Sequence, residues 1–343
     1  MDPISMVLAS AAAGGVAGKL AEKATDFVMD LVRGQDAAVQ QKAAENAASF
    51  LGALSAQLSR LEQRGGAPTE GNLDATLSDP DVAATVRTAI IGAARTENST
   101  KHAVLARAVA ERLVASAESN EALASVLAVD AIPKLSAAHL RFLGIAAVVY
   151  VVRPEPYRFG EREGHIAMQT DQPRRDRFGT WLTSVLERLH LGIVLGDLEL
   201  VHLVSTGCIT YERKLKRDLH VTLAPSHAEL ADPRAFLTAQ YHVAEFLALD
   251  PTGRDLSDLW EFGLQHVTLT PAGRLIGAAV YESVGGDPDD VGWSKVAPVP
   301  DQVINDAVWD GRTIREEFME ALDREVRNRA ERRVRPWAAL DRQ

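Results

Sequence analysis

The residues that could carry out chemistry do not form a complete catalytic motif in this sequence. The nearest approach is the segment AGGVAGKL at residues 13–20, which is close to the phosphate-binding pattern GxxxxGK[ST]. Ala13 replaces the first glycine of that pattern, and Leu20 replaces the hydroxyl residue that reaches the magnesium ion. GxSxG, HExxH and GxGxxG are absent from the sequence as well. We therefore expect no catalytic, cofactor-binding or metal-binding residue, although distant residues could still converge in a dispersed active site.

Two further residue patterns could in principle carry chemistry. His242 and Glu245 have the spacing of metal ligands on a helix, but their order reverses the Glu-x-x-His of di-iron bundles. Cys208 is the single cysteine, and a small buried thiol is its commoner role. Several histidines lie on or beside apolar helix faces and are predicted to be packing residues with satisfied hydrogen bonds: His102, His139, His190 and His202.

Composition describes a protein with room for two or three units in 343 residues. The chain is 46% hydrophobic and carries a net charge of -10, which disfavours a surface that binds nucleic acid generally. A single cysteine excludes an intrachain disulfide framework, so the reducing cytoplasm is the expected compartment.

The helical periodicity predicts a mainly α fold, with a helical bundle followed by an elaborated winged-helix-like unit that contains a few short strands. Residues 72–134 form the central bundle, in which Asp79-Pro80, Asn98 and Asn120 are expected at helix starts. Residues 135–285 form the winged-helix-like unit, because helices there alternate with the strand-like segments at residues 208–211 and 266–270. The apolar run that ends at residue 152 is expected to be a buried helix that could pass into a strand from residue 148.

Residues 1–64 form an N-terminal helical region rich in small residues. Within the uncharged run at residues 4–18, Ser10, Gly14 and Gly18 recur at intervals of four, which lets two helix backbones approach closely. A loosely packed helix, a soluble self-association helix and membrane contact through residues 4–18 all remain open. The protein is therefore expected to be cytoplasmic, with membrane association and a homo-oligomer as further hypotheses.

Basic residues concentrate in two places. Arg174, Arg175 and Arg177 form a local cluster, and residues 302–343 form an amphipathic C-terminal helix that includes Arg332 and Arg333. These five arginines are a candidate basic contact patch. The helix expected to read DNA in a winged-helix unit begins at Asp197 and is acidic and apolar, so these residues disfavour binding to nucleic acid.

Three segments carry a family resemblance: LSAAHLRFL at residues 135–143, LVSTGCI at residues 203–209 and LTPAGRLIG at residues 269–277. Together with the glycine-rich N-terminal helix, their order resembles the abortive-infection alpha proteins of bacterial phage defence. The resemblance implies a defence role and brings no catalytic residue. It favours a non-enzymatic sensor or effector that acts through an unknown protein partner. A winged-helix DNA-binding regulator and an enzyme with a dispersed site are the alternatives.

Overall fold

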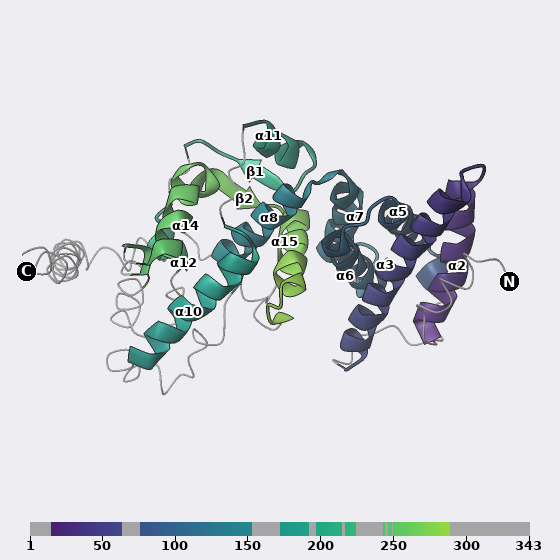
Figure 1. Cartoon of the computed structure of the whole chain (residues 1–343), viewed down its shortest axis with the longest axis horizontal. Coiled ribbons are helices and arrows are strands. Elements are labelled where there is room, and N and C mark those ends of the chain that lie inside the picture. The colour runs from purple at the N-terminus through teal and green to yellow at the C-terminus, as the bar shows by residue number, and fades with distance from the viewer. Residues whose placement is uncertain are drawn as a thin grey trace, which may run out of the picture. The chain divides into compact units, whose positions relative to one another are not determined.

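The structure is a computed structural model that describes residues 15–63, 76–152, 172–191, 197–214, 217–223, 243, 246–248 and 250–288. Within these residues the fold is mainly α-helical, as predicted, with two short strands paired in a two-stranded sheet (Figure 1). The winged-helix arrangement of the later part stays a prediction. None of the described helices is both long and apolar enough to cross a membrane.

The chain forms two compact units that are discontinuous in sequence. Unit 1 comprises Met1–Ala147, Leu195–Tyr211 and Thr268–Gly286, and unit 2 comprises Val148–Val194, Glu212–Val267 and Asp287–Gln343. The sequence-based boundaries at residues 64, 134 and 285 follow the chain instead and remain predictions.

The helices of the N-terminal two-fifths of the chain belong to unit 1. They are α2 (Gly15–Val32), α3 (Ala37–Gln63), α5 (Pro80–Ala94), α6 (Ser99–Val114) and α7 (Asn120–Ala131), followed by the 3-10 turn η1 (Ile132–Lys134). Helix α6 lies at the centre, because it packs against α3, α5, α7 and α15. An apolar stripe of α3 forms part of this core, where Phe50, Leu51, Leu54 and Leu58 are buried.

Side-chain caps begin three of these helices. Asp79 and Asn98 accept hydrogen bonds from the backbone N–H groups of Asp81 and Lys101 at the starts of α5 and α6, as expected. Helix α7 differs by one residue from the prediction, because its cap is Ser119, whose hydroxyl accepts from the N–H of Ala122.

The remaining described helices of unit 1 are α8 (Ala137–Tyr150), α11 (Asp197–Ser205) and α15 (Pro271–Ser283). Helix α8 belongs to unit 1 as far as Ala147. Strand β1 (Ile209–Tyr211) pairs with β2 (Val267–Leu269), in the positions that the sequence indicated. The alternative of a strand beginning at residue 148 is wrong, because α8 continues to Tyr150.

Two glycines of α15 allow close backbone contact. A Cβ at Gly273 would overlap the carbonyl oxygen of Cys208, and a Cβ at Gly277 would overlap the carbonyl oxygen of Leu143 in α8. Thr270 fixes the start of the same helix, because its hydroxyl accepts from the N–H of Gly273 and donates to the carbonyl of Gly207. The glycines in LTPAGRLIG are therefore packing residues.

Unit 2 contains α10 (Gln172–Arg188), α12 (Leu219–Leu223), α14 (Pro251–Glu261) and the 3-10 turn η3 (Leu264–His266). Asp250 accepts from the N–H groups of Thr252 and Gly253, so Asp250-Pro251 starts α14 in the same way that Asp79-Pro80 starts α5.

Candidate functional site

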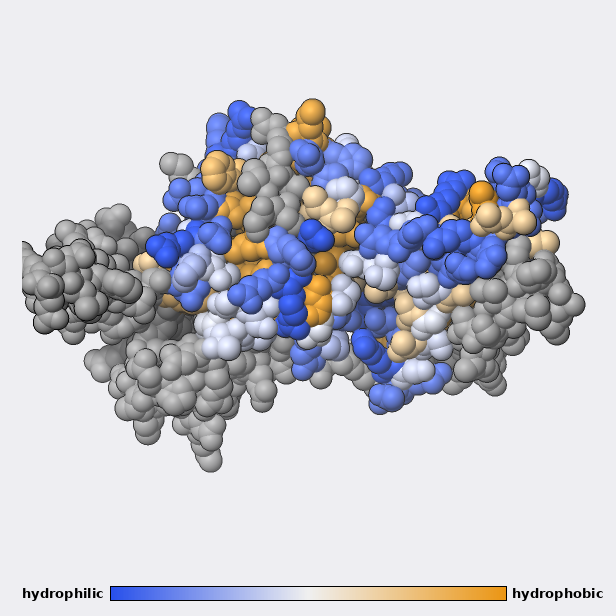
Figure 2. Space-filling model, in the orientation of Figure 1, coloured by the Kyte–Doolittle hydropathy of each residue, from blue (hydrophilic) through white to orange (hydrophobic). Residues whose placement is uncertain are grey.

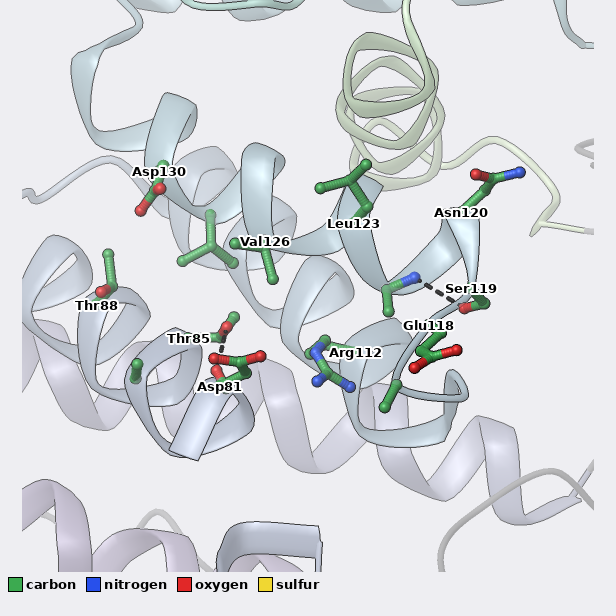
Figure 3. A pocket seen from close by; sticks show the side chains of 14 residues that line it. Asp81, Thr85, Thr88, Arg112, Glu118, Ser119, Asn120, Leu123, Val126 and Asp130 are labelled. Atoms are coloured by element: carbon green, nitrogen blue, oxygen red, sulfur yellow. Dashed lines mark hydrogen bonds between the residues drawn. The ribbon is translucent and has the colours of Figure 1, made fainter. Parts of the chain in front are cut away.

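A polar cleft of about 550 Å³ opens in unit 1 between α5, the end of α6 and α7 (Figure 3). Its volume falls within the range of small-molecule pockets, which is roughly 300–1,000 Å³. Fourteen residues line it: Asp81, Ala84, Thr85, Thr88, Arg112, Ala117, Glu118, Ser119, Asn120, Ala122, Leu123, Val126, Val129 and Asp130. All of them come from the described part of unit 1, so one compact unit supplies this wall of the cleft.

The guanidinium group of Arg112 is the unusual feature of this cleft. Its side chain is only 4% exposed, and its Nε atom has no hydrogen-bond partner among the described residues. The nearest opposite charge is Asp79, whose Oδ2 lies 4.0 Å from an Nη atom of Arg112. A buried charge is costly unless it is paired and hydrogen-bonded, so Arg112 has unused capacity for an acceptor.

The cleft also contains three carboxylates and a helix terminus. Asp81, Glu118 and Asp130 are exposed carboxylates at the lining, and in Figure 3 Asp81 and Glu118 lie on either side of Arg112. The N-terminus of α7 also reaches the cleft through Ser119 and Asn120. The first N–H groups of a helix have no intrahelical acceptor and attract negative charge. The wall thus presents donors and carboxylates together.

A second surface feature of unit 1 is the outer face of α11. Leu198, Val201 and Val204 recur at intervals of three and are 84%, 64% and 43% exposed. The opposite face carries Leu200 and Leu203, which are buried. Figure 2 shows apolar side chains at the upper edge of the molecule over α11. Helix α11 is therefore apolar on both faces, and we call the three exposed residues the α11 apolar face.

The residues that the sequence singled out fall mostly where their side chains are not described. Ser10, Gly14, Arg332 and Arg333 lie outside the described residues, as do His242 and Glu245. Gly18 lies in α2, which agrees with the predicted helix. Arg174, Arg175 and Arg177 lie in the N-terminal half of α10. Both the self-association face and the basic contact patch therefore remain predictions.

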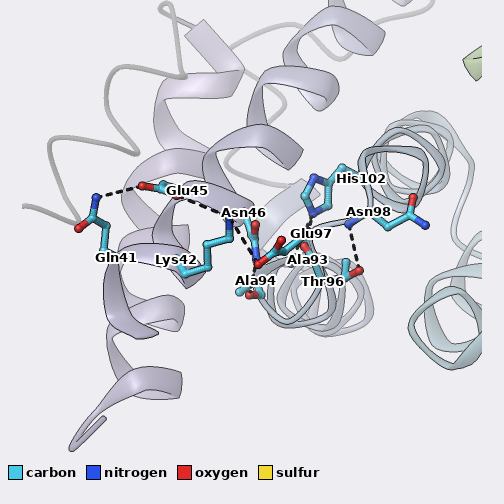
Figure 4. Close-up of polar contacts among 10 residues, drawn as sticks. All are labelled: Gln41, Lys42, Glu45, Asn46, Ala93, Ala94, Thr96, Glu97, Asn98 and His102. Atoms are coloured by element: carbon cyan, nitrogen blue, oxygen red, sulfur yellow. Dashed lines mark hydrogen bonds and ion pairs between the residues drawn. The ribbon is translucent and has the colours of Figure 1, made fainter. Parts of the chain in front are cut away.

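His102 is a packing residue, as predicted (Figure 4). Its Nδ1 lies 2.9 Å from the hydroxyl of Ser49, and its Nε2 lies 2.8 Å from the carbonyl of Thr96. Beside it, Asn46 of α3 donates to the carbonyl of Ala94 at 3.2 Å. These bonds fasten the turn between α5 and α6 to α3 and leave both ring nitrogens of His102 occupied.

His139 departs from the prediction that the histidines are satisfied. Its Nδ1 accepts from the N–H of Ser136 at 3.0 Å, so the proton lies on Nε2, which is buried and has no partner among the described residues. Its ring stacks on His202 at 5.0 Å between centroids. Burial, then the charge of His202, lower the pKa of His139, while Glu199 acts in the opposite sense and Lys101 adds to the lowering.

Two other titratable groups are held in their neutral forms. Burial raises the pKa of the Cys208 thiol, which accepts a hydrogen bond from Thr206 at 3.5 Å, so Cys208 is the buried thiol that the sequence indicated. In unit 2, burial raises the pKa of Tyr150 to about 12 against the opposing charge of Arg217, and the hydroxyl donates to the carbonyl of Leu264 at 2.6 Å. Neither group is activated as a nucleophile or a base at neutral pH.

Arg112 was not singled out by the sequence, where it is one of several polar positions on its helix. Helix α6 is buried around most of its circumference, since the successive residues Val104, Leu105 and Ala106, which point in three different directions, are all buried, as is Arg112. No signal in the sequence separates Arg112 from the neighbouring charged residues.

Groups of three or more His, Cys, Asp or Glu residues that could hold a metal ion are absent from the described part of the chain.

The fold of unit 1 and its cleft define a mainly α-helical protein with a polar pocket. The model of a protein family of unknown function matches residues 18–230, which is more than half of the chain, and the chain belongs to that family. The match includes the whole cleft and α11. No curated protein and no solved structure matches the chain. The resemblance to abortive-infection alpha proteins is not tested by these comparisons and stays a prediction.

Proposed function

We propose that this protein is a non-enzymatic sensor or effector of bacterial defence that acts through contacts with a protein partner. The observation that carries the protein-contact part is the α11 apolar face, where three aliphatic side chains stand in solvent along one side of a helix. Exposed apolar surface of this kind is typical of protein interaction sites. The defence role rests on the resemblance of the three sequence segments.

The chemistry of the described residues supports a binding role over catalysis. Cys208 and Tyr150 are neutral and hydrogen-bonded, and His102 is engaged at both ring nitrogens. A dispersed active site would need polar groups that converge with perturbed pKa values in a pocket. In the described cleft, the carboxyl groups of Asp81, Glu118 and Asp130 are solvent-exposed, which favours recognition over proton transfer.

A double substitution on the α11 apolar face tests the proposal in cells. Leu198→Glu combined with Val201→Glu places two charges on a face that is already solvent-exposed, so we expect the fold to be kept. Cells that carry this variant are expected to be as sensitive to phage as cells in which the gene is deleted. Val39→Glu in α3 is the matched control, because Val39 is a comparably exposed aliphatic residue on another helix.

Plating efficiency over a broad panel of phages is the measurement. The defence role is wrong if deletion of the gene from its own host leaves every efficiency unchanged. The protein-contact part is wrong if the double variant protects as fully as the natural chain. Light scattering of both purified proteins adds the oligomeric state, and a natural dimer that the double variant loses would identify a second copy of the chain as the partner.

A DNA-binding regulator is the alternative, and the exposed face of α11 argues against it. A reading helix needs donors that reach base edges and cations that meet phosphates. The exposed side of α11 presents Leu198, Glu199 and Val201 instead. Duplex binding at low salt that is lost on neutralising Arg174, Arg175 and Arg177 would revive this alternative.

Membrane association through residues 4–18 is a further part of the proposal, tested by flotation of the full chain with lipid vesicles beside a chain that lacks residues 1–20.

A further inference from the structure

We propose that the cleft between α5 and α7 binds a small zwitterion, an amino-acid-like molecule whose carboxylate pairs with Arg112 and whose ammonium group meets the carboxylates of the rim. This assigns a ligand class to a site that lies apart from the α11 apolar face, so it does not rest on the defence role. Three features support it: the burial of one charge, the signs of its neighbours and the position of a helix terminus.

The carboxylate end of the ligand follows from Arg112. Its guanidinium group offers five N–H donors in a planar fork that suits a carboxylate in a bidentate arrangement. In the described residues its one charged contact is Asp79 at 4.0 Å, which is beyond hydrogen-bond distance. The contrast with Arg107 on the same helix is direct, because Arg107 donates to both carboxylate oxygens of Glu282 at 3.0 and 3.2 Å. Arg112 has the same chemistry without the corresponding acceptor.

Helix α7 adds a second attraction for a negative group. Its 12 residues begin at the cleft, where Ser119 and Asn120 belong to the lining. The Ser119 hydroxyl occupies the N–H of Ala122, and the earlier N–H groups of the helix have no intrahelical acceptor. A carboxylate beside Arg112 would therefore meet both a guanidinium group and the positive end of a helix dipole.

The ammonium end follows from the acidic lining. Asp81 and Glu118 lie on either side of Arg112 in Figure 3, and Asp130 adds a third carboxylate at the far end of the lining, so the lining as a whole is negative. A purely anionic ligand would be repelled by this rim, and a purely cationic one would leave Arg112 unpaired in the interior. A molecule that carries both signs a few ångströms apart satisfies both. Leu123 and Val126 give the same cleft an apolar wall for a side chain.

Calorimetric titration of the full chain with each of the common L-amino acids at millimolar concentration tests the proposal. We expect at least one to bind, and its amide and its N-acetyl derivative to bind roughly tenfold more weakly each, because each loses one charge-assisted hydrogen-bonded pair. Arg112→Met is expected to remove binding. Glu118→Gln changes an exposed residue beside Arg112, so it keeps the fold and is expected to weaken binding several-fold, while Glu261→Gln in α14 leaves it unchanged.

Three outcomes would overturn the proposal. The first is that no amino acid binds the natural chain. The second is that the bound amino acid loses nothing on Arg112→Met and Glu118→Gln, because the ligand would then lie elsewhere. The third is that inorganic phosphate or acetate binds as tightly as the amino acid, which would make the cleft a plain anion site. If Arg112→Met does not fold, Glu118→Gln with its Glu261→Gln control decides.

Discussion

Replacement of Arg112 by methionine is expected to stabilise the ligand-free protein, although it removes a charged residue from an ion pair. Methionine keeps the length and most of the apolar stem of the side chain, so the packing of α6 is retained. The change removes a guanidinium group that is 4% exposed and has an unpartnered Nε. The outcome depends on whether the attraction to Asp79 exceeds the cost of burying this charge.

The structure sets the size of both contributions. Two unit charges at 4.0 Å attract by about 4 kcal/mol at an effective dielectric constant of about 20. The side chain of Asp79 is 35% exposed, so solvent screens the pair and leaves about 2 kcal/mol. Burial of an ion costs several kcal/mol, and the described residues leave the Nε of this one without a hydrogen bond. We therefore expect the free energy of unfolding to rise by about 1–2 kcal/mol in Arg112→Met.

Urea unfolding at neutral pH measures the effect, with Arg107→Met as the matched control. The control makes the same substitution five residues earlier on the same helix, but it removes a guanidinium group that donates to both carboxylate oxygens of the buried Glu282 and also pairs with Glu111 at 2.6 Å, so we expect a loss of about 3 kcal/mol. A loss of that size in Arg112→Met as well would refute the reasoning, because it would mean that Arg112 is already fully paired within the chain.

Three further predictions concern the fold. Gly273→Ala is expected to lower the free energy of unfolding by about 3 kcal/mol, because its Cβ would overlap the backbone of Cys208. Gly52→Ala, whose Cβ would point into open space, should raise the free energy of unfolding by up to about 1 kcal/mol. Urea unfolding compares the two variants. Asp250→Ala is expected to cost about 1 kcal/mol through loss of the α14 cap, measured as a lower thermal midpoint. The folded-state pKa of His139 is lowered, so the unfolded chain binds this proton more readily. Stability should fall as pH drops below the ordinary histidine value of 6.5, and His139→Phe should flatten that pH dependence in urea unfolding.

The sequence predicted helices and their starts well where local chemistry decides them. Asp79 and Asn98 cap the helices that their positions indicated, and Gly207 ends α11 with a φ of 72°, which favours glycine. At Asp250-Pro251, which starts α14, the local pattern does not decide between two structures. A proline can end the helix before it or start the helix after it, so the local pattern leaves the choice to tertiary contacts.

The polar cleft could not be predicted from the sequence for a different reason, which two arginines of α6 illustrate. Arg107 and Arg112 are both charged residues on a helix that α3, α5, α7 and α15 surround, so neither has an ordinary solvated face. Whether each arginine is paired depends on the position of its counter-ion. That position depends on which other helix packs beside the arginine in the folded chain. Glu282 reaches Arg107 from α15, 175 residues away in sequence, and both of its carboxylate oxygens accept from one Nη atom of Arg107.

Among the described residues, the one charged contact of Arg112 is Asp79 at 4.0 Å, and Arg112 also lines the cleft. If the chain used Arg112 solely for stability, an apolar residue would serve better at that depth, since a poorly paired buried charge is a net cost. The cost is understandable if the arginine is kept for an acceptor that arrives from outside the chain. The proposed ligand also accounts for the acidic rim, because carboxylates for which the described residues show no ion pair with Arg112 favour a ligand that brings its own positive charge.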